Sequence, residues 1–293
     1  MSQKIYTSAP LPFQGQKRRH VKEFSKIVQQ SKAPIYVDLF GGSGLLSHTA
    51  KRNYPKSRVI YNDFDGYNVR LSNVDKTNAL LADLRLILSD YPKEKRITGK
   101  TKDLVIQRLS VENSKGYPVD WITVSSSLLF SMNYVMSFAE FEKQSLYNCI
   151  RLADYDVSGY LDGLEVVCMD YKDLFNQYKD VPGVVFLIDP PYLSTDVSTY
   201  NSGSYWKLKD YLDVLNTLKG VNYVFFTSNK SNVVELAEWI ETNLNAINPF
   251  NGAIRKEVAA NMNYSSKYVD IMLYKIIKEK PSKEGLNQFV LAA

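Results

Sequence analysis

Val184-Val185-Phe186-Leu187-Ile188-Asp189-Pro190-Pro191-Tyr192 runs from five apolar residues directly into an acid, two prolines and a tyrosine. A short apolar run that stops at a turn signal is typical of a buried strand. The two prolines end the strand, because they lack backbone N–H groups and their φ is fixed. A carboxylate, two rigid carbonyls and an aromatic ring are therefore presented at the carboxyl end of a strand, where open α/β sheets bind ligands. Asp189 and a proline carbonyl can accept the two N–H groups of an exocyclic amine, and Tyr192 can stack on its ring.

Other apolar runs on both sides of this strand predict the rest of the sheet. Further strands are expected at residues 35–39, 58–61, 164–168, 223–227 and 268–274. Helix-compatible segments at residues 45–52 and 231–244 alternate with them. Strands that alternate with helices favour a largely parallel sheet covered on both faces.

One long segment departs from this alternation. Residues 84–160 carry few strand signals and several stretches of helical apolar spacing, separated by Tyr91-Pro92 and Gly116-Tyr117-Pro118. We therefore predict a helical insertion at 84–160 between the second and third strands. Residues 1–83 and 161–280 would then form one α/β domain, and residues 281–293 a polar tail.

Composition is that of an ordinary globular protein, with 45% hydrophobic and 23% charged residues in a chain of 293. No apolar stretch reaches the length of a membrane span, and the N-terminus lacks the apolar core of a signal peptide. The two cysteines, Cys149 and Cys168, are expected to be free thiols in a reducing cytoplasm, and no metal site is expected. A net charge of +5 permits a polyanionic partner.

A glycine-rich loop, Phe40-Gly41-Gly42-Ser43-Gly44, follows the strand at 35–39 and precedes a helix. Such a loop lets a ligand approach the backbone closely, although a plain structural turn has the same appearance. Asp63, at the end of the next strand, stands where an acid binds ribose hydroxyls in nucleoside-binding folds. The third glycine of a dinucleotide site and the Gly-Lys-Ser/Thr of a P-loop are both absent. A nucleoside without a pyrophosphate fits better, and S-adenosylmethionine is the obvious one.

Together these motifs resemble the Dam-like, D12-class DNA adenine-N6 methyltransferases of the alpha group. The order matches: glycine loop first, target-recognition segment next, and the Asp189 tetrapeptide last. Shorter segments also resemble motifs of the family: Pro12-Phe13-Gln14-Gly15-Gln16-Lys17, Asn62-Asp63, Asp170-Tyr171 and residues 192–215 and 265–274. Gln16 departs from the family pattern, in which a second glycine is common at that position.

The resemblance implies a Rossmann-like S-adenosylmethionine-dependent methyltransferase fold, with a mostly parallel seven-stranded sheet and a mainly helical inserted target-recognition domain. It implies an enzyme that transfers a methyl group from S-adenosylmethionine to a flipped-out adenine in double-stranded DNA and releases S-adenosylhomocysteine. The catalytic residues would be Asp189, Pro190, Pro191 and Tyr192.

The family pattern also assigns binding residues. Lys17 would hold the methionine carboxylate, Asp63 the ribose, and Asp170 with Tyr171 the adenine of the cofactor. The full expected cofactor set is Phe13, Lys17, Asp38, Phe40, Gly41, Gly42, Gly44, Asp63, Asp170 and Tyr171. The expected DNA contacts are Arg18, Arg19, Lys93, Arg96 and Tyr200. We expect a monomer or weak dimer in the cytoplasm of a prokaryotic cell or a virus-infected host.

Several other functions share this chemistry. Cytosine-N4 methyltransferases use a similar tetrapeptide, more often with Ser first and Trp last, so Asp189 and Tyr192 favour adenine. RNA adenine-N6 methylation needs the same groups. A catalytically silent DNA-binding relative would keep the fold, but the intact tetrapeptide argues against it. The recognised sequence and any paired restriction enzyme cannot be read from the sequence.

Overall fold

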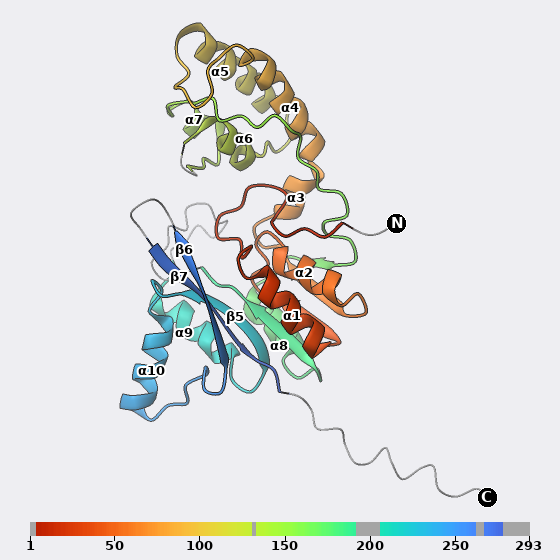
Figure 1. Ribbon diagram of the computed structural model, residues 1–293, viewed down its shortest axis with the longest axis vertical. Coiled ribbons are helices and arrows are strands. Elements are labelled where there is room, and N and C mark those ends of the chain that lie inside the picture. The colour runs from red at the N-terminus through yellow and green to blue at the C-terminus, as the bar shows by residue number, and fades with distance from the viewer. Residues whose placement is uncertain (1–3, 131–132, 192–205, 262–266, 278–293) are drawn as a thin grey trace, which may run out of the picture.

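Residues 4–130, 133–191, 206–261 and 267–277 are described by the computed structural model of the chain. They form a sheet with covering helices and, above one edge of that sheet, a separate group of helices (Figure 1). Tyr192, Tyr200 and the expected tail at 281–293 lie outside the described residues.

The sheet has seven strands in the order β3-β2-β1-β4-β5-β7-β6. Neighbouring strands from β3 to β5 are parallel, and β7 runs antiparallel to both β5 and β6. The predicted mostly parallel seven-stranded sheet is thus confirmed. The strands are β1 (Ile35–Asp38), β2 (Arg58–Asn62), β3 (Glu165–Val167), β4 (Val184–Ile188), β5 (Asn222–Ser228), β6 (Ile254–Asn261) and β7 (Lys267–Lys275).

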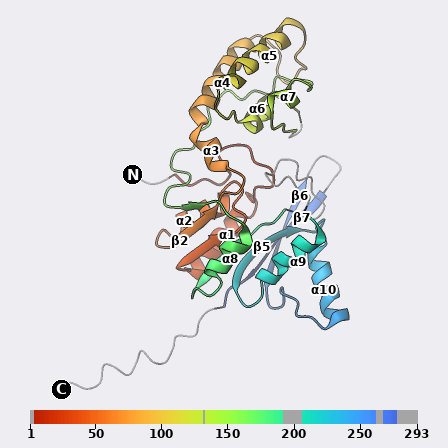
Figure 2. The same ribbon diagram turned by 180° about the vertical axis from the view of Figure 1, so that it is seen from behind.

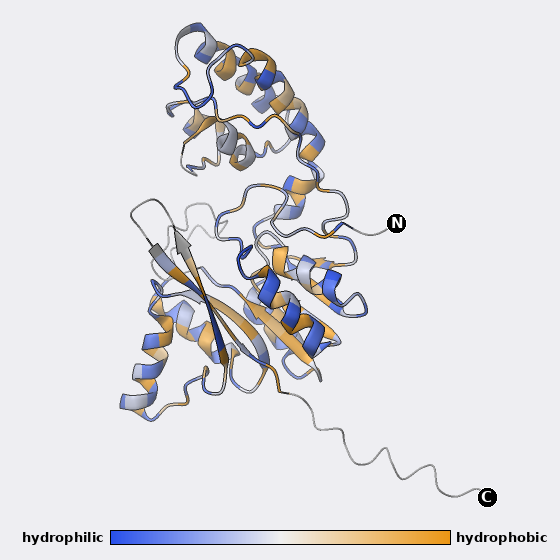
Figure 3. Ribbon diagram, viewed as in Figure 1, coloured by the Kyte–Doolittle hydropathy of each residue, from blue (hydrophilic) through white to orange (hydrophobic). Residues whose placement is uncertain are grey.

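The central strands are apolar on both sides because helices cover both faces of the sheet. In β4, Val184, Phe186 and Ile188 pack with Leu174 of α8, Val214 of α9 and Ala237 of α10. Val185 and Leu187 face the other way, toward α1 and α2. Figure 3 shows this apolar centre between helices of mixed polarity. The covering helices are α1 (Val21–Ser31), α2 (Leu45–Asn53), α8 (Tyr171–Tyr178), α9 (Leu208–Thr217) and α10 (Val233–Leu244).

The position of the site follows from the strand order. The next strand along the chain, β2, pairs with one side of β1, and β4 pairs with the other side of β1. The loops that leave β1 and β4 therefore diverge and open a crevice at the carboxyl ends of these strands. We call this edge of the sheet the carboxyl edge. The glycine loop leaves β1 at this edge, and the Asp189 tetrapeptide leaves β4 beside it.

The helices above the sheet share one apolar cluster with Tyr6 and Leu11 of the N-terminal segment, with Tyr67 and Leu71, and with Tyr160. The predicted start of the insertion, residue 84, falls inside α4, and α4 contacts α5 and α6. We therefore propose that the insertion begins with α4, and we call residues 74–155 the helical body. Figure 2 shows α3 joining this body to the core. The helices of the body are α4 (Val74–Ile87), α5 (Gly99–Asn113), α6 (Trp121–Leu128) and α7 (Phe138–Phe141), and α3 (Tyr67–Ser72) precedes them.

The N-terminal segment before α1 is held across the carboxyl edge by buried polar contacts. The backbone N–H of Tyr6 donates to His48 Nε2 at 3.0 Å, so Nδ1 carries the ring proton and donates to the Tyr160 carbonyl at 2.7 Å. Burial lowers the pKa of His48 to about 4, which keeps the ring neutral. Further along, the Tyr67 hydroxyl bonds both the N–H and the carbonyl of Leu11. These contacts bring the following residues, up to Lys17, to the crevice.

Candidate active site

A cavity of about 280 Å³ lies at the carboxyl edge, where β1 and β4 end. Its walls come from the N-terminal segment, the glycine loop, the ends of β2 and β4, and the starts of α8 and α9. Of the predicted site residues, the cavity is lined by Phe13, Lys17, Phe40, Gly41, Gly42, Asp170, Tyr171, Asp189 and Pro191. Segments far apart in the sequence thus meet around one cavity.

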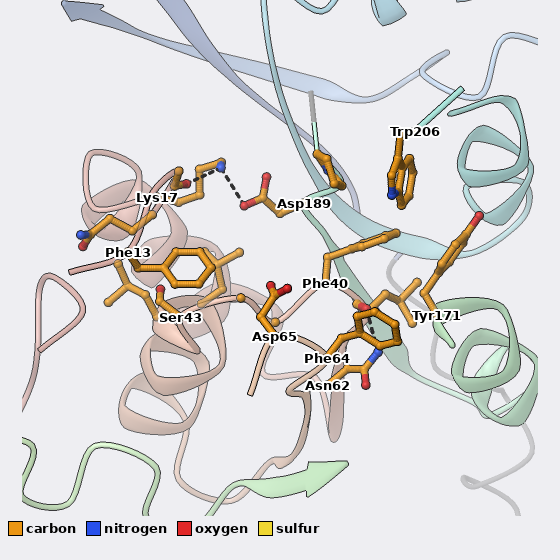
Figure 4. A pocket seen from close by; sticks show the side chains of 18 of the residues that line it. Phe13, Lys17, Phe40, Ser43, Asn62, Phe64, Asp65, Tyr171, Asp189 and Trp206 are labelled. Carbon is orange, nitrogen blue, oxygen red and sulfur yellow. Dashed lines mark hydrogen bonds and ion pairs between the residues drawn. The ribbon is translucent and has the colours of Figure 1, made fainter. Parts of the chain in front are cut away.

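Lys17, which is buried, and Asp189, which is partly buried, form an ion pair at one end of the cavity (Figure 4). Lys17 Nζ lies 2.7 Å from Asp189 Oδ2, and it also donates to the Gly15 carbonyl at 2.7 Å. The other carboxylate oxygen, Oδ1, is buried, and no group in the described part of the chain donates a hydrogen bond to it. Burial raises the pKa of Asp189 to about 6, although the Lys17 ammonium opposes this rise.

The glycine loop approaches β2 too closely for a side chain. A Cβ on Gly41 would lie 2.3 Å from the Tyr61 ring and 2.7 Å from the Asn62 carbonyl oxygen. Gly42 has a φ of +49°, a conformation that favours glycine. Gly44 does not line the cavity; with φ +72° it forms the N-cap of α2. Gly41 and Gly42 therefore present bare backbone to the cavity, and Gly44 starts the helix.

Three aromatic rings gather at the other end of the cavity, as Figure 4 shows. The ring centroids of Phe40 and Tyr171 are 4.8 Å apart. Trp206 stacks on Tyr171 at 6.0 Å and meets Phe40 at 5.7 Å. Asp170 borders this end, where its carboxylate caps α8 by accepting the Lys172 N–H at 2.7 Å. Such an arrangement suits a flat, aromatic ligand group.

Asp63 is placed differently from the expectation that it binds the ribose. It is buried and absent from the cavity wall. Its carboxylate accepts the N–H groups of Tyr67 at 2.7 Å and Asn68 at 2.8 Å, which caps the start of α3. Asp65, two residues further on, lines the cavity instead. Asp63 thus stabilises the start of α3, whereas Asp65 is part of the cavity wall.

Asp38 was also expected among the cofactor residues, and the structure places it beneath the glycine loop rather than in the cavity wall. It is fully buried, and the Ser47 hydroxyl donates to its Oδ2 at 2.7 Å. Burial raises the pKa of Asp38 to about 7. Asp38 therefore connects the end of β1 to the first turn of α2, and this contact stabilises the glycine loop between them.

The residues expected to contact DNA are divided between the sheet domain and the helical body. Arg18 and Arg19 are exposed on the domain that contains the sheet, directly after Lys17. Lys93 and Arg96 are exposed on the helical body, where Lys93 Nζ donates to the Ile150 carbonyl at 2.7 Å. Basic residues are thus present both on the core and on the helical body.

Sequence patterns missed several residues of the cavity wall: Phe64, Asp65, Met169 and Trp206. Asp65 belongs to the run Asn62-Asp63-Phe64-Asp65, which offers two acids without indicating which one faces a ligand. Within the described ranges, no group of three or more His, Cys, Asp or Glu side chains is arranged to hold a metal ion. Nor does that part of the chain include a helix with the length and apolarity to cross a bilayer.

The chain is similar to a known family and to a named protein. Residues 13–248 match the sequence model of the family described as D12 class N6 adenine-specific DNA methyltransferase. Over 282 residues the chain is 36% identical to a protein of Haemophilus influenzae named "Putative methyltransferase", with 94% of each chain covered. The family match spans both strands that carry the cavity as well as the helical body.

Proposed function

Because the chain belongs to the D12 class of N6 adenine-specific DNA methyltransferases, we propose that the cavity binds S-adenosylmethionine and that Asp189 receives the target adenine beside it. The observation that carries this proposal is the state of Asp189. One carboxylate oxygen is held by Lys17, and the other is buried without a donor in the described residues. A buried acceptor without a partner is costly unless a ligand supplies the donor.

The lining residues fit the parts of S-adenosylmethionine. The Lys17 ammonium suits the methionine carboxylate, Asp65 suits the ribose hydroxyls, and the rings of Phe40, Tyr171 and Trp206 suit the adenine. Gly41 and Gly42 leave room for the ligand to lie against the backbone. When bound, this cofactor supplies an electrophilic methyl group on a sulfonium.

Asp189 and Pro190 would act on the amine of the target base. The N6 lone pair of adenine is delocalised into the ring, so the amine is a weak nucleophile. Hydrogen bonds from the amine to Asp189 Oδ1 and to the Pro190 carbonyl favour a tetrahedral nitrogen, and they strengthen as positive charge develops there. An adenine in a duplex must first be flipped out, which costs a few kcal/mol. Tyr192 would replace part of the lost stacking.

Nucleoside analysis tests the reaction directly. The protein is incubated with labelled S-adenosylmethionine and unmethylated duplex DNA, single-stranded DNA or RNA, and the products are digested to nucleosides. We expect N6-methyladenine from duplex DNA. N4-methylcytosine, or transfer to RNA alone, would favour the corresponding alternative, and cofactor binding without any transfer would indicate a silent relative.

A matched pair of substitutions tests the choice of Asp65 over Asp63. Asp65→Ala should weaken cofactor binding about tenfold, because it removes a charged acceptor from the cavity wall. Asp63→Ala should instead lower the free energy of unfolding by about 1–2 kcal/mol, because α3 loses its cap. Calorimetric titration and denaturant unfolding of both variants measure the two effects. The assignment would be reversed if Asp63→Ala lost the cofactor at unchanged stability.

We further propose that the core contacts the DNA backbone around Tyr268. Arg19 lies against the Tyr268 hydroxyl, and Lys230 Nζ lies 5.4 Å from the centroid of the Tyr268 ring. Lys230 follows the end of β5, and Arg19 follows Lys17, so both are at the carboxyl edge near Asp189. Lys93 and Arg96 would meet the DNA from the helical body.

The salt dependence of DNA binding tests this proposal. Removing one cation that neutralises a phosphate should reduce the slope of log K against log salt concentration by about 0.9. Lys230→Gln should show that change, and Arg19→Gln a similar one. Lys219→Gln is the control, because Lys219 is exposed at the opposite edge of the sheet, before β5. Equal slopes for Lys230→Gln and the wild type would remove Lys230 from the DNA-binding surface.

A further inference from the structure

We propose that Lys17 has a second role besides cofactor binding: its ammonium keeps Asp189 ionised, so that the carboxylate can act on the amine at neutral pH. This inference rests on the proposed function, because it concerns the same site. It makes Lys17 a positioning residue for the methyl transfer itself. The two roles predict different kinetic effects, and they can be separated.

The charges that face Asp189 come from three directions. Lys17 approaches from the N-terminal segment, and its side chain is only 7% exposed. Asp270 lies on β7, where it is paired with Ser228 at the end of β5, the neighbour of β4, and its negative charge acts on Asp189. Asp38 is fully buried at the end of β1, the other neighbour of β4. Among these groups, Lys17 is the cation, and Asp270 and Asp38 are two acids besides Asp189.

This balance decides the protonation state of Asp189. Burial and the negative charge of Asp270 both favour the neutral acid, and Lys17 is the group that opposes them. With Lys17 in place, the pKa of Asp189 is about 6, so the carboxylate is ionised at pH 7.5. Removing the Lys17 ammonium takes away an opposite charge 2.7 Å from Asp189, so we expect the pKa of Asp189 to rise by about one to three units. Asp189 would then be largely protonated at pH 7.5.

The ionised form matters for the transfer. The N6 lone pair forms the new N–C bond while the C–S bond breaks with its electrons on sulfur, and the proton lost from N6 passes to Asp189 and on to solvent. A carboxylate opposes the positive charge that develops on N6, whereas a neutral acid does so weakly. An ammonium has three N–H groups, so Lys17 can hold Asp189 and a ligand carboxylate at the same time.

The pH dependence of kcat at saturating S-adenosylmethionine separates the two roles, because saturation removes the effect of weaker cofactor binding. For the wild type we expect kcat to fall below about pH 6. Lys17→Met should move this fall upward by about one to three pH units, with activity recovering as the pH rises. Lys17→Arg keeps the positive charge, so its kcat should fall below about the same pH as that of the wild type, whatever the substitution does to the KM for the cofactor. Lys26→Met is the control, because Lys26 is exposed on α1 and pairs with Glu23.

A second readout needs no activity. Infrared difference spectra of the ligand-free protein follow the protonation of buried carboxyl groups during a pH titration. Asp189→Asn identifies the band of Asp189 and separates it from that of Asp38, which also titrates near neutral pH. We expect the Asp189 band of Lys17→Met to titrate at least about one pH unit above that of the wild type.

The outcomes are distinct. If Lys17→Met raises only the KM for the cofactor, and neither the pH profile nor the Asp189 band moves, Lys17 is a cofactor anchor alone and the inference is wrong. If the wild type transfers no methyl group to any nucleic acid, the proposed function fails. The infrared titration would still show whether Lys17 controls the ionisation of Asp189.

Discussion

Asp189→Ala is expected to slow methyl transfer to DNA about a hundred- to a thousand-fold, the range seen when one preorganised group is removed from an active site. The variant loses the buried Oδ1 that would accept the N6 hydrogen bond. Binding of S-adenosylmethionine should remain the same or become tighter, because Lys17 would no longer be shared with a carboxylate. Single-turnover rates and calorimetric titration measure the two quantities.

Asp156→Ala is the matched control for this substitution. Asp156 is also an acid paired with a lysine, Lys4, and neither residue lines the cavity. Its removal should leave both the transfer rate and the cofactor affinity unchanged. Near wild-type turnover of Asp189→Ala would mean that the reacting amine binds elsewhere.

Gly41→Ala is expected to have the largest effect on the cofactor site. The new Cβ would lie 2.3 Å from the Tyr61 ring, a buried side chain that cannot move aside freely. The loop must shift, which should cost about 3 kcal/mol of unfolding free energy and weaken cofactor binding at least tenfold. Denaturant unfolding and calorimetric titration test both expectations.

Gly220→Ala is the comparison that isolates steric contact. Gly220 has a φ of +75°, but a Cβ on this residue would have no atom within 4 Å among the described residues. Only the backbone conformation opposes a side chain there, so a loss of about 1–2 kcal/mol is expected without any change in cofactor affinity. If Gly41→Ala behaved like Gly220→Ala, the close approach of the loop to β2 would have no part in ligand binding.

Most strands of the sheet could be predicted from the sequence, because buried parallel strands appear as apolar runs. β4 is buried along its whole length, and it matches the predicted run at residues 184–188. β6 gave no such signal, because it is an edge strand with the exposed polar residues Arg255, Lys256 and Glu257. The start of the helical insertion has no clear signal in the sequence, because α4 has the same apolar spacing on both sides of residue 84.

Site residues could be predicted where a proline or glycine motif fixes the backbone. The role of a single side chain was harder to predict where two or more partners are possible. The prolines and glycines placed Asp189 and the glycine loop at one cavity. Asp63 and Asp65 differ only in which one caps α3, and that choice depends on the turn between β2 and α3. The pairing of Lys17 with Asp189 joins residues 172 positions apart in the sequence, and no local pattern indicates it.

The position of S-adenosylhomocysteine in a crystal of the complex tests the central claim most directly. The account predicts that the sulfur lies in the cavity beside Asp189, with the carboxylate of the ligand at Lys17 and its adenine among Phe40, Tyr171 and Trp206. A ligand bound outside this cavity, or a sulfur separated from Asp189 by the rest of the ligand, would contradict it.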